Sequence, residues 1–179
     1  MKKYIALLRG INVGGKNRIS MPVLRTVFEE LGFSDVVTYI NSGNVVFSSV
    51  IQDEVELIKK CEEVILERFK LTIPVAVISA DDLAEAMENA PEWWNTDKES
   101  VHYTIFVLSP IRVEEIYAGA GEVNPEFEQV GHHGNVIFWS APLKTYSKAK
   151  WSKIARSSVN SHVTIRNANT VNKLLLMTQ

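Results

Sequence analysis

The chain has 179 residues, of which 46% are hydrophobic and 22% are charged, with 9 Gly and 6 Pro. A chain of this length buries roughly 70% of the surface that it exposes when unfolded, so it folds without disulfides as one ordinary domain or two small ones. This composition excludes disordered, collagenous and low-complexity proteins. The apolar run at residues 4–8 ends at Arg9, so no export signal is expected, and no run approaches the length of about 18 residues that a membrane span needs. A cytoplasmic protein is therefore expected.

Charge is distributed unevenly along the chain although the net charge is only −2. Residues 1–28 carry six basic residues and no acid, residues 29–128 hold all 21 acidic residues against six basic ones, and residues 129–179 carry seven basic residues and no acid. If the fold brings the two basic ends together, they form one positive surface for an anionic partner. The alternative is that each basic segment packs against the acidic middle.

The first half of the chain predicts the order β-α-β-β-α-β. Residues 3–8 form a strand, Ser20 is a suitable N-cap for a helix that stops at Gly32, and residues 36–40 and 44–48 form a hairpin. The turn of this hairpin, residues 41–43, places Gly43 where a positive φ is expected. An amphipathic helix at 53–69 and a strand at 74–78 complete a ferredoxin-like unit.

The second half repeats this order more weakly, after a connecting helix that Ser79 and Asp82 cap and that extends to about residue 89. The elements expected in it are a strand at 101–108, central in its sheet, a helix at 113–118, strands at 127–130 and 135–140 around a turn at 131–134, a basic helix at 145–157, a strand at 163–166 and a helix at 170–177. The predicted fold class is α+β, with two ferredoxin-like (βαββαβ) halves packed in one compact protein. The first subdomain spans 1–79, the connection 80–100 and the second subdomain 101–179.

A glycine-rich loop follows the first strand. Its sequence, Gly10-Ile-Asn-Val-Gly-Gly-Lys-Asn17, matches a nucleotide-binding P-loop at both glycines and the lysine, but has Asn17 where the magnesium-binding Ser or Thr belongs. The helix also begins later than in a P-loop, so a nucleotide triphosphatase is not expected. What the loop offers is a set of backbone N–H groups with Arg9, Lys16 and Arg18 for a phosphate or another anion. The alternative is a merely solvated loop.

The other isolated signals favour structural roles. His132 and His133 are adjacent and lack the partners of a metal set, so they are interpreted as turn residues. Cys61 lies on the apolar stripe of its helix, which indicates a buried thiol rather than a nucleophile. The tryptophans are expected mostly in packing roles, because the strands lack the aromatic signature of an RNA-recognition motif. No metal or cofactor is predicted.

Three motifs resemble the bacterial family called domain of unknown function 1697. They are residues 4–17, YIALLRGINVGGKN, residues 38–47, TYINSGNVVF, and residues 164–171, TIRNANTV. The resemblance covers the whole chain, although Ala168 stands where the family usually has Trp. It implies a pair of ferredoxin-like subdomains, in agreement with the periodicity, and no established activity.

The polar positions of these motifs are Arg, Lys, Asn, Ser and Thr, without Asp, Glu, His or Cys, which favours anion binding over acid–base or covalent catalysis. The leading hypothesis is one polar surface that recognises nucleic acid or another phosphate-bearing ligand. Its candidate binding residues are Arg9, Asn12, Lys16, Ser42, Asn44, Arg166 and Asn167. An enzyme with Ser42 or Lys16 as reactive group and Arg166 as anion clamp is one alternative. A structural clasp between the halves is another.

Overall fold

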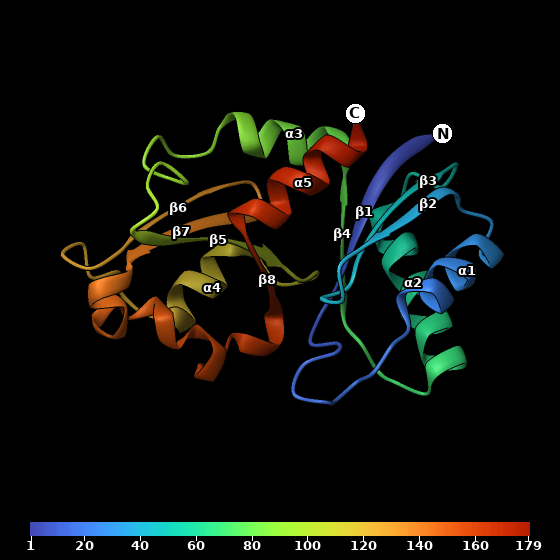
Figure 1. The fold of residues 1–179 in the computed structure, drawn as a ribbon, viewed down its shortest axis with the longest axis horizontal. Helices are drawn as coiled ribbons and strands as arrows, with labels where there is room; N and C mark the ends of the chain where they lie inside the picture. The colour runs from blue at the N-terminus through green and yellow to red at the C-terminus, as the bar shows by residue number, and fades with distance from the viewer. The chain divides into compact units, whose positions relative to one another are not determined.

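The computed structural model describes all residues, 1–179, and contains two four-stranded antiparallel sheets (Figure 1). The chain folds as two compact units, Met1–Ala84 with Lys173–Gln179, and Glu85–Asn172. The division falls within helix α3 (Ala80–Glu88) and within helix α5 (Ala168–Thr178). No helix combines the length and apolar content that crossing a membrane requires.

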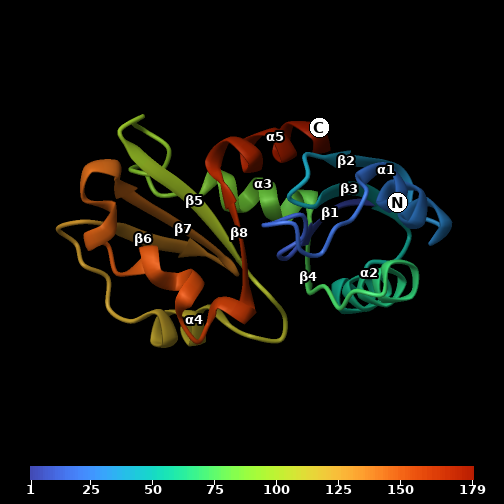
Figure 2. The same ribbon diagram turned by 60° about the horizontal axis from the view of Figure 1, so that its bottom comes forward.

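The first unit has the predicted βαββαβ order. Its elements are β1 (Lys2–Leu8), α1 (Met21–Glu30), β2 (Ser34–Tyr39), β3 (Asn44–Ser49), α2 (Glu54–Phe69) and β4 (Val75–Ser79). The strand order β2-β3-β1-β4 leaves β1 and β3 in the interior of the sheet. Both helices cover one face of it (Figure 2). On this face Phe28 and Cys61 share a core with Phe47. Burial raises the pKa of the Cys61 thiol, as expected of a structural cysteine.

The second unit repeats the plan with one replacement. It contains β5 (Ser100–Val107), α4 (Val113–Ala120), β6 (Gln129–His133), β7 (Val136–Pro142) and β8 (Val163–Asn167) in the order β6-β7-β5-β8. The central position predicted for β5 is thereby confirmed. Where the second helix of a ferredoxin-like unit belongs, the chain forms three short 3₁₀ helices, at Leu143–Lys148, Trp151–Arg156 and Asn160–His162. Both four-stranded sheets confirm the α+β class and the two ferredoxin-like halves.

Two local predictions in the second unit are wrong. The basic helix expected at 145–157 is interrupted at Ala149, whose backbone is extended with φ −66° and ψ 127°. The carboxylate of Glu128 explains the interruption, because it accepts hydrogen bonds from the backbone N–H groups of Lys150 and Trp151, each at 3.0 Å.

The turn expected at 131–134 is instead mostly strand, since β6 continues to His133. The chain reverses at Gly134, whose φ is +53°.

Helix α2 begins beside a partly buried acid. The Asp53 carboxylate caps this helix by accepting the N–H groups of Val55 and Glu56, at 2.9 and 3.3 Å. The next residue, Glu54, has a pKa raised above 4.5, first by burial and then by the charge of Asp82, against an opposing hydrogen bond from the Ser79 backbone N–H. The ionised carboxylate therefore costs stability at neutral pH.

Replacing Glu54 by glutamine is expected to raise the melting temperature at pH 7. Because the folded-state pKa lies above the unfolded one, the protonated acid adds stability below pH 4.5, and this contribution is lost as the pH rises through the folded-state value. Thermal melts from pH 7 to pH 4 should therefore show a gain for the variant that disappears at the acidic end. Glu63→Gln, at an exposed site of the same helix, serves as the control. An equal gain at both ends of the range would contradict this assignment.

Candidate functional site

The loop between β1 and α1 is a tightly folded segment. Residues 10, 12, 14, 15 and 17 all have positive φ, between +48° and +75°, and these residues are glycine or asparagine, which tolerate the left-handed region best. A small bridge closes the tip, with the Lys16 N–H donating to the Val13 carbonyl at 3.0 Å. Asn17 donates its amide to the Gly10 carbonyl at 3.0 Å. The loop is therefore ordered by its own hydrogen bonds.

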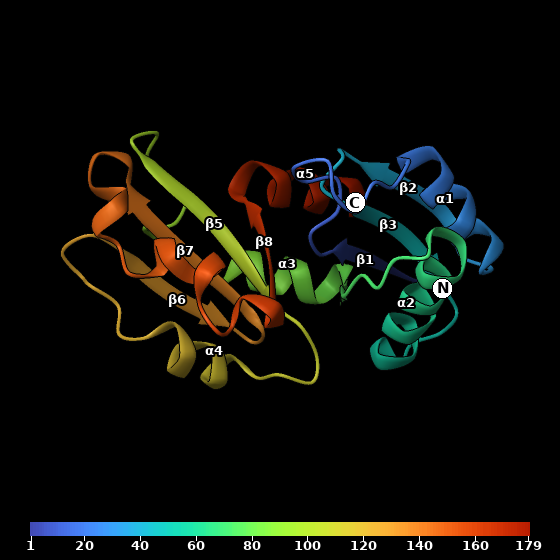
Figure 3. The same cartoon turned by 90° about the horizontal axis from the view of Figure 1, so that it is seen from below.

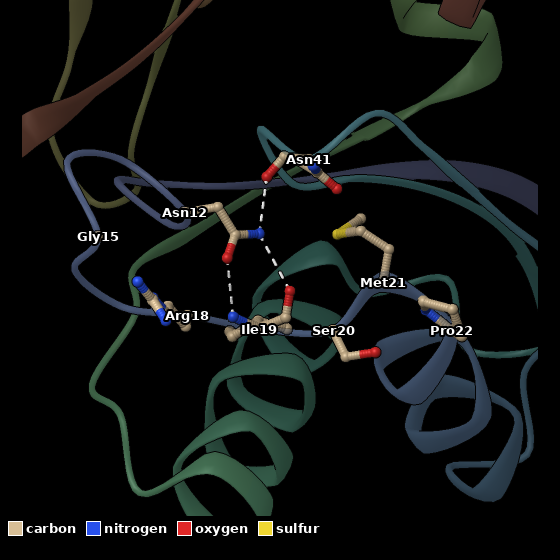
Figure 4. A pocket seen from close by; sticks show the side chains of 8 residues that line it. All are labelled: Asn12, Gly15, Arg18, Ile19, Ser20, Met21, Pro22 and Asn41. Atoms are coloured by element: carbon tan, nitrogen blue, oxygen red, sulfur yellow. Dashed lines mark hydrogen bonds between the residues drawn. The ribbon is translucent and has the colours of Figure 1, made fainter.

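Asn12 fixes this loop to its surroundings. Its side-chain amide donates to the carbonyls of Ile19, at 3.0 Å, and Asn41, at 2.9 Å, while its oxygen accepts the Ile19 N–H at 2.9 Å (Figure 4). Both amide hydrogens are thus used within the protein. Asn12 therefore positions the loop and brings it next to the β2–β3 turn, and its predicted role in ligand binding stays a prediction.

An open hollow of about 580 Å³ lies between this loop and the start of α1 (Figure 4). It is lined by Asn12, Gly15, Arg18, Ile19, Ser20, Met21, Pro22 and Asn41. Arg18 folds back over the loop, so that a Cβ added at Gly15 would lie 3.6 Å from its Nη2. Ser20 is the N-cap of α1 as predicted, but its hydroxyl makes no capping hydrogen bond, and the first turn of α1 carries no acid.

The charge at this hollow is uncompensated. Lys16 and Arg18 are both exposed, and neither forms an ion pair with a carboxylate within 4.0 Å. The acidic residues at the far end of α1 are already paired, Glu29 with Arg25 at 2.9 Å and Glu30 with Arg68. The positive potential of Lys16, Arg18 and the helix N-terminus is consequently directed at solvent.

The loop does not adopt the conformation of a nucleotide-binding P-loop. In that motif the lysine stands at the start of a helix, whereas here Lys16 belongs to the loop and α1 begins only at Met21. Asn17, at the position of the metal-binding hydroxyl, is engaged with the Gly10 carbonyl.

The remaining predicted binding residues occupy separate places. Asn44 is fully buried and closes the β2–β3 turn, donating to the Tyr39 carbonyl at 2.9 Å and to the Ser42 hydroxyl at 3.0 Å. The backbone N–H of Arg9 donates to the Pro74 carbonyl at 2.9 Å. Together with Asn12 and Lys16, these residues all belong to the first unit.

Arg166 and Asn167 belong to the second unit. Arg166 is only 7% exposed, and its Nη1 donates to the Thr164 hydroxyl and the Ile165 carbonyl, at 2.8 and 2.9 Å. Burial lowers the pKa of Arg166 to about 10, so the guanidinium stays charged at neutral pH. Asn167 caps α5, because its Oδ1 accepts the Thr170 N–H at 2.8 Å.

The second unit also contains a serine–histidine contact that the sequence did not indicate. His102 Nδ1 lies 2.6 Å from the Ser140 hydroxyl, an arrangement that resembles an activated nucleophile. The same nitrogen accepts the Asn95 N–H at 3.0 Å, and Nε2 lies 2.8 Å from the Asp97 carbonyl. Since both ring nitrogens are engaged and Ser140 is only 5% exposed, this contact ties residues 95–97 to the sheet.

The adjacent histidines make separate contacts. His132 Nδ1 lies 3.3 Å from the Gly134 carbonyl, and His133 Nε2 lies 3.1 Å from the Glu85 carboxylate. No group of three or more His, Cys, Asp or Glu side chains is arranged to hold a metal ion.

Asn41 and Ser20 are the polar uncharged residues of the hollow that the sequence did not indicate as binding residues, and Arg18 is expected from the sequence only as a nearby charge. For Ser20 and Arg18 the available signal is the absence of acids from residues 1–28, which marks the segment but not the residues that line the hollow. Asn41 lies outside this segment, and the signal does not reach it.

Known proteins resemble this chain both in sequence and in fold. The family model described as "Protein of unknown function (DUF1697)" matches residues 1–138. Among solved structures, the conserved bacterial protein SP0830 from Streptococcus pneumoniae is similar, with 31% sequence identity, a TM-score of 0.90 and 99% of each chain covered. No curated protein matches. Since the family model spans most of the chain, the protein belongs to the DUF1697 family of proteins of unknown function.

Proposed function

We propose that this protein is a cytoplasmic binding protein for phosphate-bearing ligands, with nucleic acid or a nucleotide as the ligand class, and that the β1–α1 loop is its contact site. One observation carries the proposal: Arg18 lines a hollow at the start of α1, Lys16 follows Gly15 of its lining in the chain, and no carboxylate pairs with either cation. Cationic side chains without a carboxylate partner, close to backbone N–H groups, suit an anion that has several oxygen acceptors.

The loop chemistry supports binding in preference to turnover. Residues 9–28 contain no Asp, Glu, His or Cys, so nothing in this segment can serve as general base or covalent nucleophile at neutral pH other than hydroxyls and the lysine amine. Asn12 and Asn17 use their amides to hold the loop in shape. A rigid, preorganised loop lowers the entropic cost of binding without requiring a reactive group.

The roles within the site follow from these contacts. Arg18 presents a planar set of donors over the loop, which matches two oxygens of one phosphate. Lys16 contributes a point charge at the tip of the loop, and the Ser20 hydroxyl is free of a capping bond at the helix start. The proposal rests on these first-unit residues and leaves Arg166 and Asn167 in the structural roles described above.

Replacing Arg18 by alanine is expected to weaken binding of a fluorescein-labelled single-stranded RNA by about 1 to 3 kcal/mol at low salt, because a charge-assisted contact to phosphate is lost. Lys16→Ala should act in the same direction. Fluorescence anisotropy measures both, and competition with inorganic phosphate and with a free nucleotide separates a polymer ligand from a small one. Melting temperatures should change little, since both side chains are exposed.

Arg25→Ala is the matched control. It removes the same charge from the same unit, but Arg25 lies on α1 and is paired with Glu29. Equal losses for Arg18→Ala and Arg25→Ala would mean that only net charge matters. An absence of binding to RNA, nucleotide and phosphate at the lowest usable salt would refute the proposed function.

A further inference from the structure

Most basic side chains in residues 1–84 of the first unit are bonded to other groups of the protein. Five of them lie within 4.0 Å of a carboxylate, and two more donate to backbone carbonyls at 2.8 and 3.0 Å. Those in ion pairs are Lys2, Arg25, Lys59, Lys60 and Arg68, and those that donate to carbonyls are Lys3 and Lys70. Their charge is therefore compensated or directed into the protein.

Lys16 and Arg18 differ from these residues, because the side chain of neither forms an ion pair or a hydrogen bond within the protein. Both lie in the connection from β1 to α1, which is blue in Figure 3. Arg18 lines the hollow at the start of α1, and Lys16 follows Gly15 of the same lining. The uncompensated charge of these two side chains is therefore concentrated in one short stretch of chain.

The surface next to the hollow does not continue this positive charge. The only basic residue of α1, Arg25, is paired with Glu29 at 2.9 Å. On the other side, the turn at residues 40–43, which contributes Asn41 to the hollow, has no Lys or Arg. Proteins that bind a single strand along its length use a positively charged groove that spans about 4 to 16 nucleotides. The charges around this hollow therefore suit one phosphate group and not a series of them.

Two cations match a phosphate monoester better than a backbone diester. A monoester carries a charge of about −1.5 to −2 at pH 7 and three acceptor oxygens, since its second pKa is about 6. A phosphate within a strand carries one negative charge and has one free oxygen fewer. The planar guanidinium of Arg18 can bind two oxygens of a monoester, and the Lys16 ammonium supplies the second positive charge.

The hollow also has room for the group that carries the phosphate. Its volume of about 580 Å³ lies within the range of roughly 300 to 1,000 Å³ that is usual for sites of single small ligands. The Ser20 hydroxyl, which makes no capping bond, and the Asn41 side chain line the same hollow (Figure 4). A hydroxyl and a side-chain amide each offer a donor and an acceptor, which suits the hydroxyl groups of a sugar.

We propose that this hollow binds a terminal phosphate monoester, at the end of a nucleic-acid strand or on a mononucleotide, in preference to the internal diesters of a strand. The inference rests on the proposed function and narrows its ligand class. Arg18 and Lys16 bind the phosphate dianion, and Ser20 and Asn41 contact the sugar that carries it.

The test uses the intact protein and one single-stranded RNA sequence, labelled on an internal base, in three forms. One form has a 5′-phosphate, one has a 3′-phosphate, and one has hydroxyls at both ends. We expect one of the phosphorylated forms to bind at least tenfold more tightly in fluorescence anisotropy than the form with hydroxyl ends. This preference should shrink as the pH is lowered from about 7.5 to about 5, because the monoester loses its second charge. Competition by a nucleoside monophosphate, with the nucleoside as control, shows whether a mononucleotide is sufficient or a strand end is required.

Variants connect the preference to the hollow. Arg18→Ala should abolish it, and Arg18→Lys, which keeps the charge but loses the planar donors, should retain only part of it. Arg25→Ala, which removes a paired cation, should keep it in full. Equal binding of the three RNAs that still depends on Arg18 would overturn this inference and leave the proposed function standing. If none of the RNAs and no nucleotide binds at low salt, both are refuted.

Discussion

Replacing Glu128 by alanine is expected to lower the free energy of unfolding by at least about 3 kcal/mol, since loss of a buried charged acceptor leaves several donors unsatisfied. The Glu128 carboxylate is 3% exposed and accepts four N–H groups. These donors are the backbone N–H groups of Asn124 and Lys150 on Oε1, and the Trp151 backbone N–H and the Trp139 indole N–H on Oε2, all at 2.9 to 3.0 Å.

The Glu128 side chain thus anchors the 3₁₀ helices that replace a regular helix. In Glu128→Gln one oxygen remains as an acceptor, but the amide NH₂ group replaces the other oxygen and faces two N–H donors. This variant should therefore also be substantially destabilised. Urea unfolding curves give the free energies, and Glu126→Ala, at an exposed site in the same segment, should change them little. A loss below about 1 kcal/mol for Glu128→Ala would show that these four hydrogen bonds contribute little to the free energy of unfolding.

Gly43→Ala is expected to destabilise the protein by about 2 to 4 kcal/mol, from backbone strain and overpacking together. Gly43 has φ +87°, as the turn chemistry predicted, and an added Cβ would lie 2.8 Å from Leu8 Cβ and from Ile11 Cδ1. Gly32 is the matched control because its φ is +86° and an added Cβ meets nothing within 4 Å. Gly32→Ala should therefore show the strain alone, roughly 1 kcal/mol. Equal losses at the two sites in thermal melts would contradict a steric contribution at Gly43.

The sheets were predictable from the sequence because their signals are local. Ser20 and Asp53 are the N-caps of α1 and α2, and residues 41–43 link β2 to β3. Alternation and helical spacing identified the remaining strands and helices to within a few residues. Those signals depend only on neighbours along the chain.

The 3₁₀ region was not predictable in this way. Its sequence has helical composition, and the side chain that interrupts it, Glu128, precedes Lys150 and Trp151 by 22 and 23 residues. No periodicity reveals such a distant acceptor. The same applies to His133, which was expected in a turn and lies in β6, where its ring contacts Glu85.

The residue types in the sequence indicated the candidate site, whereas the hydrogen bonds of its residues could not be predicted. The acid-free segment includes the β1–α1 loop, in which Lys16 lies, and the binding role of Lys16 stays a prediction. The sequence could not show that Asn12 and Asn44 donate their amides to carbonyls, nor that Arg166 is buried. Such distinctions depend on which donors the backbone already occupies, and only the folded chain determines that.

The salt dependence of single-stranded RNA binding tests the central claim most directly. If Lys16 and Arg18 contact phosphates, the logarithm of the binding constant should fall linearly with the logarithm of salt concentration, by roughly 0.7 for each phosphate neutralised. Arg18→Ala should reduce this slope by about one such increment, and Arg25→Ala should leave it unchanged. Binding that is insensitive to salt, or no binding to RNA, nucleotide or phosphate at low salt, would contradict phosphate recognition by the β1–α1 loop.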